Sequence, residues 1–183
     1  MQTLLLELTR RYGEPHRHYH TIEHIADMLH RGRALALSEE QMMAIWFHDA
    51  VYEPRSDTNE EDSAKLAGER LGTLGWSAAR IEVVQRIVLD TKSHRPSFPD
   101  AEPVIDLDMS PLAAEPAVYE RNRKNVRLEY AHVPEADYRR GLRAFAESLL
   151  AWPRIFWTDW GTALEAPARR NLADTIARLD TQT

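Results

Sequence analysis

A His-Asp pair inside an apolar run constrains this chain more than any other feature of its sequence. The run covers residues 46–52 and holds His48 and Asp49 side by side. Such a segment is expected to be buried, yet a buried carboxylate without a partner is costly or must take up a proton. A divalent cation would offset this cost, because imidazole and carboxylate groups are both good metal ligands. The pair therefore predicts a partly buried metal site.

The spacing of the apolar residues predicts an all-α fold. Apolar positions recur mostly with the period of a helix, there are only 7 glycines, and no segment alternates as a β-strand would. The chain has 183 residues and neither a repeat nor a linker, so we expect one domain over residues 1–183, a single helical bundle. The predicted helices cover about 2–12, 18–36, 38–51, 58–74, 78–91, 110–132, 134–151 and 166–180, with loops at 53–57 and 93–103.

Several helix boundaries carry capping signals. Ser38 is followed three residues later by Gln41, the spacing of a capping box. Gly75 is predicted to end one helix, and Ser77 to cap the next. Pro134 suits the first turn of the helix that follows it.

Composition excludes several classes of function. The net charge is -6, from 23 basic and 29 acidic residues, and the basic residues are dispersed, so a nucleic-acid polymer is not an expected partner. There is no cysteine for a disulfide, a thiolate site or a nucleophile. No signal peptide and no apolar stretch near the roughly 20 residues of a membrane span is present, so we expect a cytoplasmic protein that does not bind membranes. A helical domain of this size often forms a homodimer, which the sequence leaves open.

Two further histidines lie upstream of the His-Asp pair. His20 and His24 are four residues apart, so on a helix both would project from one face. Alone, this spacing is weak support for a metal site, since one surface and one packed histidine would give the same pattern. His48 and Asp49 diverge by roughly 100° on a helix but can both reach an ion that lies between them.

Downstream residues add candidates with open alternatives. Asp106 and Asp108 could each supply a carboxylate, and His94 is either a phosphate or metal contact or a solvated loop histidine. Glu61 and Lys65 are four residues apart on a predicted helix. They could orient a water and bind phosphate, or form an ordinary surface ion pair, which is the favoured interpretation.

In their order along the chain these elements resemble the HD-domain superfamily of metal-dependent phosphohydrolases, above all a bacterial branch of predicted HD phosphohydrolases. The first element is also similar to the start of the cyclic-nucleotide phosphodiesterase motif. The resemblance covers nearly the whole chain. It is carried by Tyr19-His20-x-x-x-His24-Ile25, residues 46–52, Asn59-Glu60-Glu61-x-Ser63-Ala64, Thr91-x-x-His94 and Asp106-x-Asp108, and more weakly by Arg127-x-Glu129-Tyr130 and Ala168-Arg169-x-Asn171-Leu172.

The resemblance implies a metal-ligand set of His24, His48, Asp49 and Asp108. Asp108 is preferred to Asp106 because the residues that follow it look like the phosphodiesterase stretch after its last ligand. By the same likeness the first histidine, His20, would be the catalytic proton donor, although His20 and His24 stay open as alternatives for the ligand. Asp49 would be catalytic as well, as a bridge to a second ion.

The resulting expectation is a phosphohydrolase that uses metal-activated water on a small phosphorylated metabolite, with a nucleotide as the leading candidate. Glu61, Lys65 and His94 are its candidate substrate contacts. The mixed nitrogen and oxygen donors suit Mn, Fe, Co, Ni, Zn or Mg without selecting one. Two alternatives belong to other classes: a di-iron oxygenase of the HD fold, and a non-catalytic sensor that binds a metal or nucleotide.

Overall fold

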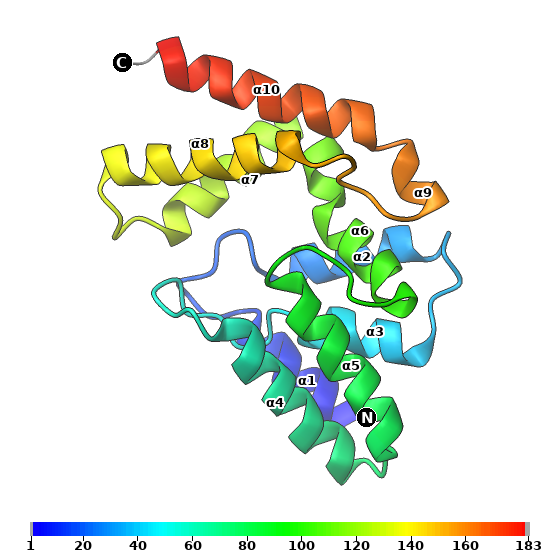
Figure 1. The fold of residues 1–183 in the computed structure, drawn as a ribbon. Helices are drawn as coiled ribbons and strands as arrows, with labels where there is room; N and C mark the ends of the chain where they lie inside the picture. Colours follow the sequence, from blue (N-terminus) through cyan, green and yellow to red (C-terminus); the bar gives the residue numbers. More distant parts are fainter. Residues whose placement is uncertain (1, 182–183) are drawn as a thin grey trace. The chain divides into compact units, whose positions relative to one another are not determined.

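The computed structural model describes residues 2–181, and these residues form ten α-helices, two short 3₁₀ helices and no β-strand (Figure 1). The predicted all-α fold is therefore confirmed. No helix in this part of the chain combines the length and the apolar character needed to cross a membrane. The elements are α1 (Gln2–Arg11), α2 (Ile22–Gly32), α3 (Glu39–Phe47), α4 (Asn59–Thr73), α5 (Ala78–Thr91), η1 (Pro99–Ala101), α6 (Glu102–Met109), η2 (Ser110–Ala113), α7 (Pro116–Glu129), α8 (Glu135–Ala151), α9 (Asp159–Thr162) and α10 (Glu165–Thr181).

The helices group into two compact units. The first unit ends at Asp108 and the second begins at Met109, so α1 to α6 belong to the first unit, apart from the last residue of α6, and η2 and α7 to α10 belong to the second. Each unit has its own set of buried apolar side chains. The expectation of one domain over residues 1–183 stays a prediction.

The first unit is built around the pair α4 and α5, which lie side by side (Figure 1). Helix α3 packs against both, and α2 packs against α3. Apolar side chains of α1, α2, α3, α5 and α6 are fully buried, and each such side chain contributes about 1.5–3 kcal/mol on burial. This core positions the ends of α2, α3 and α6, which carry the candidate ligands. Its largest members include Leu8, Ile25, Phe47, Ile87 and Leu107.

In the second unit α8 lies beside α10 (Figure 1), and α10 and α7 both pack on η2. Polar contacts connect these elements as well as apolar packing, and those of Thr175 and Asn171 lie inside the unit. The hydroxyls of Tyr119 on α7 and Thr175 on α10 are 3.0 Å apart in the buried interior. The side-chain amide of Asn171 donates to the carbonyl oxygens of Leu112 and Ala114, both at 2.8 Å. Asn171 therefore satisfies carbonyl groups at the end of η2 that have no partner within a regular helix.

Several helices begin or end at the capping residues that the sequence predicts. The Ser38 hydroxyl accepts from the backbone N–H of Gln41 at 3.1 Å, and the Gln41 side chain accepts from the N–H of Ser38 at 2.9 Å, which confirms the capping box of α3. Ser77 caps α5 through the N–H of Arg80. Gly75 has a φ of 79°, a left-handed conformation that lies just beyond the end of α4.

Helix α2 is shorter at both ends than the predicted helix over 18–36. Its N-cap is Thr21, whose side chain accepts from the N–H of Glu23. Beyond its C-terminus, Ala36 has a φ of 47°, which a right-handed helix cannot contain. The boundary matters for the site, because His20 lies before the helix and not on the same helical face as His24.

Helix α3 ends at Phe47, earlier than the predicted boundary near residue 51. The N–H of Ala50 bonds to the carbonyl of Phe47 at 3.0 Å, a tighter turn than an α-helix makes. The next residue, Val51, exchanges both backbone groups with the hydroxyl of Ser63 on α4, at 3.0 and 3.3 Å. A tertiary contact thus replaces the helical hydrogen bonds that the sequence alone would favour.

Helix α6 was not predicted, since its first residues were assigned to a proline-containing loop. The prolines are compatible with helix here, because Pro99 opens η1 and Pro103 is the second residue of α6. The first turn of a helix does not use its N–H groups internally, so a proline at these positions removes no hydrogen bond. The consequence for the site is that Asp108 projects from a helix and not from a loop.

Candidate metal centre

Three segments of the first unit carry the candidate ligands. His24 lies in the first turn of α2, three residues after the N-cap Thr21. His48 follows the last residue of α3 as its C-cap, and Asp49 lies in the turn after it. Asp108 is the penultimate residue of α6. Folding therefore brings together side chains that are up to 84 positions apart in the sequence.

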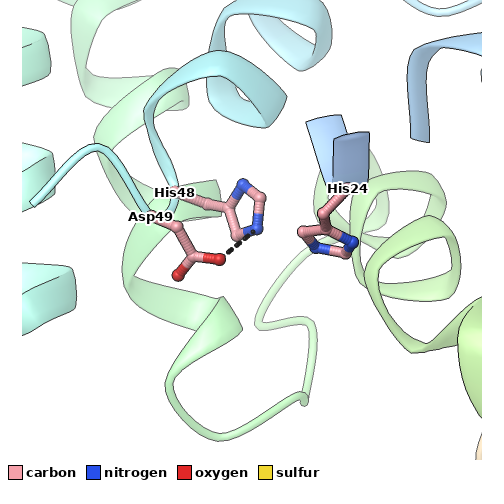
Figure 2. A group of neighbouring side chains, drawn as sticks. All are labelled: His24, His48 and Asp49. Atoms are coloured by element: carbon pink, nitrogen blue, oxygen red, sulfur yellow. Dashed lines mark ion pairs between the residues drawn. The ribbon is translucent and has the colours of Figure 1, made fainter. Parts of the chain in front are cut away.

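His24, His48 and Asp49 form a group that can hold a metal ion (Figure 2). Each offers one ligand atom, and these atoms all lie within 4.8 Å of one another. The Nε2 of His48 is 3.0 Å from an Asp49 carboxylate oxygen. Both histidines are buried, and the side chain of Asp49 is 15% exposed. Such a group is small enough for one cation to touch all three donors at once.

The orientation of His48 suits a metal ligand. Its Nδ1 donates to the carbonyl of Ile45 at 2.9 Å, so the proton of the neutral ring is held there and the Nε2 lone pair faces the group. This buried Nε2 has no hydrogen-bond partner of acceptable geometry, although the Asp49 carboxylate is close. A short distance from Nε2 to the carboxylate without a well-directed hydrogen bond is expected for two ligands of one cation. Such ligands point at the ion and not at each other.

Asp108 lies against both histidines. One of its carboxylate oxygens is 3.1 Å from Nε2 of His24 and 3.6 Å from Nε2 of His48. Its side chain is 14% exposed. The fourth ligand predicted from the sequence is therefore adjacent to the three-residue group, on the side of the two imidazoles.

The charges of the group perturb one another. Burial alone would lower the pKa of His48, but the neighbouring Asp49 carboxylate, with a smaller contribution from Asp108, outweighs it and raises that pKa to about 9. Burial would likewise raise the pKa of Asp49, but the charges of His48 and His20 hold it far below its usual range. The pKa of Asp108 is also lowered against its burial, mainly by the hydrogen bond from His24. Both carboxylates are therefore ionised near neutral pH, and His48 carries a proton when no cation is present.

His20, the predicted proton donor, lies beside the group but not within it. Its ring centroid is 6.3 Å from that of His24. It packs on the ring of Tyr52 at 4.4 Å and against Tyr19 at 4.9 Å. His20 is half-buried, and its imidazole is in contact with the aromatic rings of Tyr19 and Tyr52.

His94 borders the site, whereas Asp106 leaves α6 on a different face from Asp108. The Nε2 of His94 is 3.8 Å from the second carboxylate oxygen of Asp108, so this loop histidine borders the site. Its φ of 53° is rare outside glycine, and such strain costs about 1 kcal/mol or more. Asp106 is fully buried, and two residues on a helix diverge by about 200°, so it and Asp108 leave α6 on different faces.

Glu61 and Lys65 are not part of the group. Glu61 forms an ion pair with Lys92 on the surface, and Lys92 also donates to the carbonyl of Asp57. This pair lowers the pKa of Glu61 and raises that of Lys92. Lys65 is exposed on α4. A surface ion pair was the favoured interpretation for Glu61, but its partner is Lys92, 31 residues away, and not Lys65.

Several residues that hold the site in place are not recognisable in the sequence. Ser63 anchors Val51, and the side-chain amide of Asn59 bonds to both backbone groups of Glu53, at 2.9 and 3.0 Å. Both anchors belong to the segment 59–64 that carries part of the family resemblance, but nothing in their spacing revealed the contact. Arg17 was not recognised as part of the site, because in the sequence residues 16–18 look like an ordinary cluster of charged residues.

Comparison with known proteins gives no match. No protein-family model matches this chain, and no curated protein or solved structure matches it either. The resemblance to the HD-domain superfamily therefore stays a prediction from the residues quoted for it. What the site can do has to be inferred from its donor atoms, burial and charge.

Proposed function

We propose that this protein is a metal-dependent phosphohydrolase of the HD-domain type that acts on a small phosphorylated metabolite, with a nucleotide as the leading candidate. One observation carries the proposal. Two buried imidazoles and two carboxylates converge in the first unit, and the inward-facing Nε2 of His48 has no well-directed hydrogen-bond partner. Ligands at such a site are neutral histidines and ionised carboxylates, so the group balances the charge of one divalent cation.

The residues fit a cation from the first transition series or magnesium. Imidazole donors suit Mn, Fe, Co, Ni and Zn, while carboxylates also suit Mg, and no thiolate is present to narrow the choice. We assign His24, His48, Asp49 and Asp108 as the residues that would hold it. His94, which borders Asp108, is the nearest candidate for a phosphate contact or for a second ion.

A bound divalent ion supplies Lewis acidity, which lowers the pKa of a water molecule and offsets charge on phosphoryl oxygens. The chain's own part is orientation and proton transfer. Asp49 keeps an ionised carboxylate at the site, which can help to hold the ion and can orient a nucleophilic water by accepting a hydrogen bond from it. His20, half-buried and close to His24, can donate a proton to the leaving oxygen of the substrate.

This division of labour predicts the result of His20→Ala. Turnover should fall by about 100-fold or more, because a general acid typically contributes 10²–10⁴ in rate. Metal content should stay at the wild-type level, because His20 lies outside the ligand group. His30→Ala is the matched control, since His30 is an exposed histidine of α2. Equal loss of metal and turnover in His20→Ala would instead move His20 into the ligand set.

The proposed function is tested by phosphate release from a broad panel of nucleotides, sugar phosphates and phosphodiesters. The purified protein is assayed with added Mn²⁺ or Co²⁺ and, in parallel, with excess chelator. Release that depends on the metal supports the proposal and identifies the substrate class. Metal binding without release from any compound would overturn it and favour oxygen chemistry at iron or a sensory role.

A further inference from the structure

Arg17 lies between the two segments that carry the candidate ligands. It precedes the turn that leads into α2, and its side chain is completely buried. A buried guanidinium keeps its charge and needs hydrogen-bond acceptors for its donors, because leaving them without partners is strongly unfavourable. The partners of Arg17 therefore show what the surrounding structure uses this charge for.

The acceptors come from both segments. Nη1 donates to the carbonyl oxygen of His20 at 3.1 Å and to that of Asp49 at 2.7 Å. Nη2 donates to the carbonyl of Ala50 at 3.4 Å, and Nε to the carboxylate of Glu14 at 3.0 Å. Because one nitrogen serves both His20 and Asp49, those two carbonyl oxygens lie within about 6 Å of each other.

Aromatic rings hold the guanidinium in place. Its carbon lies 5.1 Å from the ring centroid of Tyr12 and 5.3 Å from that of Tyr52. The Tyr12 hydroxyl donates to the carbonyl of Trp46 in α3, at 3.0 Å. Tyr52 in turn packs on the ring of His20. A planar cation held against two rings has little freedom to follow a displaced carbonyl.

We propose that Arg17 is a positioning residue of the metal centre. By bonding to the carbonyls of His20 and Asp49, it holds the segment that carries His20 and His24 in place against the segment that carries His48 and Asp49. Its bonds to these two segments go to backbone carbonyl oxygens and not to ligand atoms, so it acts on the ligands through the backbone that carries them. This proposal rests on the proposed metal-binding function. It adds a residue that fixes the distance between the segment with His24 and the segment with His48 and Asp49.

Arg169 in the second unit shows the same bonding pattern, and none of the partners to which it donates is a candidate ligand residue. Its Nε donates to Glu165 at 2.6 Å, and its Nη atoms donate to the carbonyls of Leu150 and Trp152 at 3.0 and 2.7 Å. Each of these arginines thus joins one glutamate to backbone carbonyls of another segment. Arg169→Lys is therefore a matched control for a loss of backbone bonding that has only structural consequences.

The test measures Co²⁺ affinity by visible absorption in wild type, Arg17→Lys, Glu14→Ala and Arg169→Lys, below the unfolding transition of the least stable variant. Lysine keeps the charge but lacks the planar fork that reaches several acceptors. Arg17→Lys should bind Co²⁺ about 10- to 100-fold more weakly, the usual effect of losing a partner that orients metal ligands. Glu14→Ala, which frees only the Nε end, should weaken affinity in the same direction but by less than Arg17→Lys, because the bonds to His20 and Asp49 stay. Arg169→Lys should lower the unfolding temperature and leave Co²⁺ affinity unchanged.

Each outcome decides one question. Wild-type affinity in Arg17→Lys would overturn the positioning role while leaving the metal centre intact. If that variant does not fold, Glu14→Ala decides, because Glu14 is partly exposed and its loss should not unfold the protein. An affinity loss in Arg169→Lys equal to that in Arg17→Lys would assign both effects to stability and also overturn the role. A wild type that takes up no Co²⁺ would overturn the metal centre itself, and the positioning role with it.

Discussion

Replacing His48 with alanine should reduce the affinity for Mn²⁺ or Co²⁺ by more than about 100-fold, because losing even an outer partner of a ligand costs about 10- to 100-fold. His48 is fully buried, its ring is oriented by the carbonyl of Ile45, and its Nε2 is the inward-facing donor of the group. Metal-dependent turnover should disappear with the ion. The check is a metal titration followed by calorimetry or by Co²⁺ absorption.

Folding has to be measured beside binding in this variant. Without His48, the Asp49 carboxylate loses its closest positive partner, so the metal-free variant should be less stable by a few kcal/mol. Helical circular dichroism at low temperature shows whether it still folds. His30→Ala, an exposed substitution on α2, should change neither quantity. A folded His48→Ala protein with wild-type affinity would remove His48 from the ligand set.

The second large expected effect is the dependence of metal affinity on pH. Affinity for a divalent cation should rise about tenfold per pH unit up to about pH 9, because binding must displace the proton that His48 carries in the metal-free protein. The lowered pKa values of Asp49 and Asp108 keep both carboxylates ionised over this range, so they add no slope. Between about pH 7 and 8.5 the gain should be about 30-fold. Titrations of one metal at several pH values measure it directly.

The proton on His48 should also make the folding stability of the metal-free protein depend on pH. The pKa of His48 is raised on folding from its usual 6.5 to about 9, so its contribution is complete below about pH 6.5 and is lost as the pH rises through 9. The loss between about pH 7 and 9 is expected to be about 2 kcal/mol. Urea unfolding in chelator should show it in wild type and not in His48→Ala. A pH-independent metal affinity together with a flat stability profile would mean that His48 is already neutral without the ion.

Local features of the sequence were sufficient for most of the helices. The capping box of Ser38 and Gln41, the cap at Ser77 and the left-handed Gly75 act within a few residues, so they could be predicted and are confirmed. Boundaries that depend on distant partners were wrong. Helix α3 stops early because Ser63 takes the backbone groups of Val51. Helix α6 was missed because proline content suggested a loop, although prolines are harmless in a first turn.

The candidate site, too, could be predicted from the sequence only in part. The sequence by itself determined that His48 and Asp49 need a charge partner, because a His-Asp pair in an apolar run is costly to bury alone, while the other ligands were only implied by the family resemblance. Only the tertiary structure decided that Asp108 and not Asp106 lies against the two imidazoles, that Glu61 pairs with Lys92, and that His20 stands outside the ligand group. It alone revealed Arg17, because a guanidinium bonded to backbone carbonyls leaves no pattern in side-chain spacing. Ligand type is a property of single residues, whereas distance between ligands is a property of the packed helices that carry them.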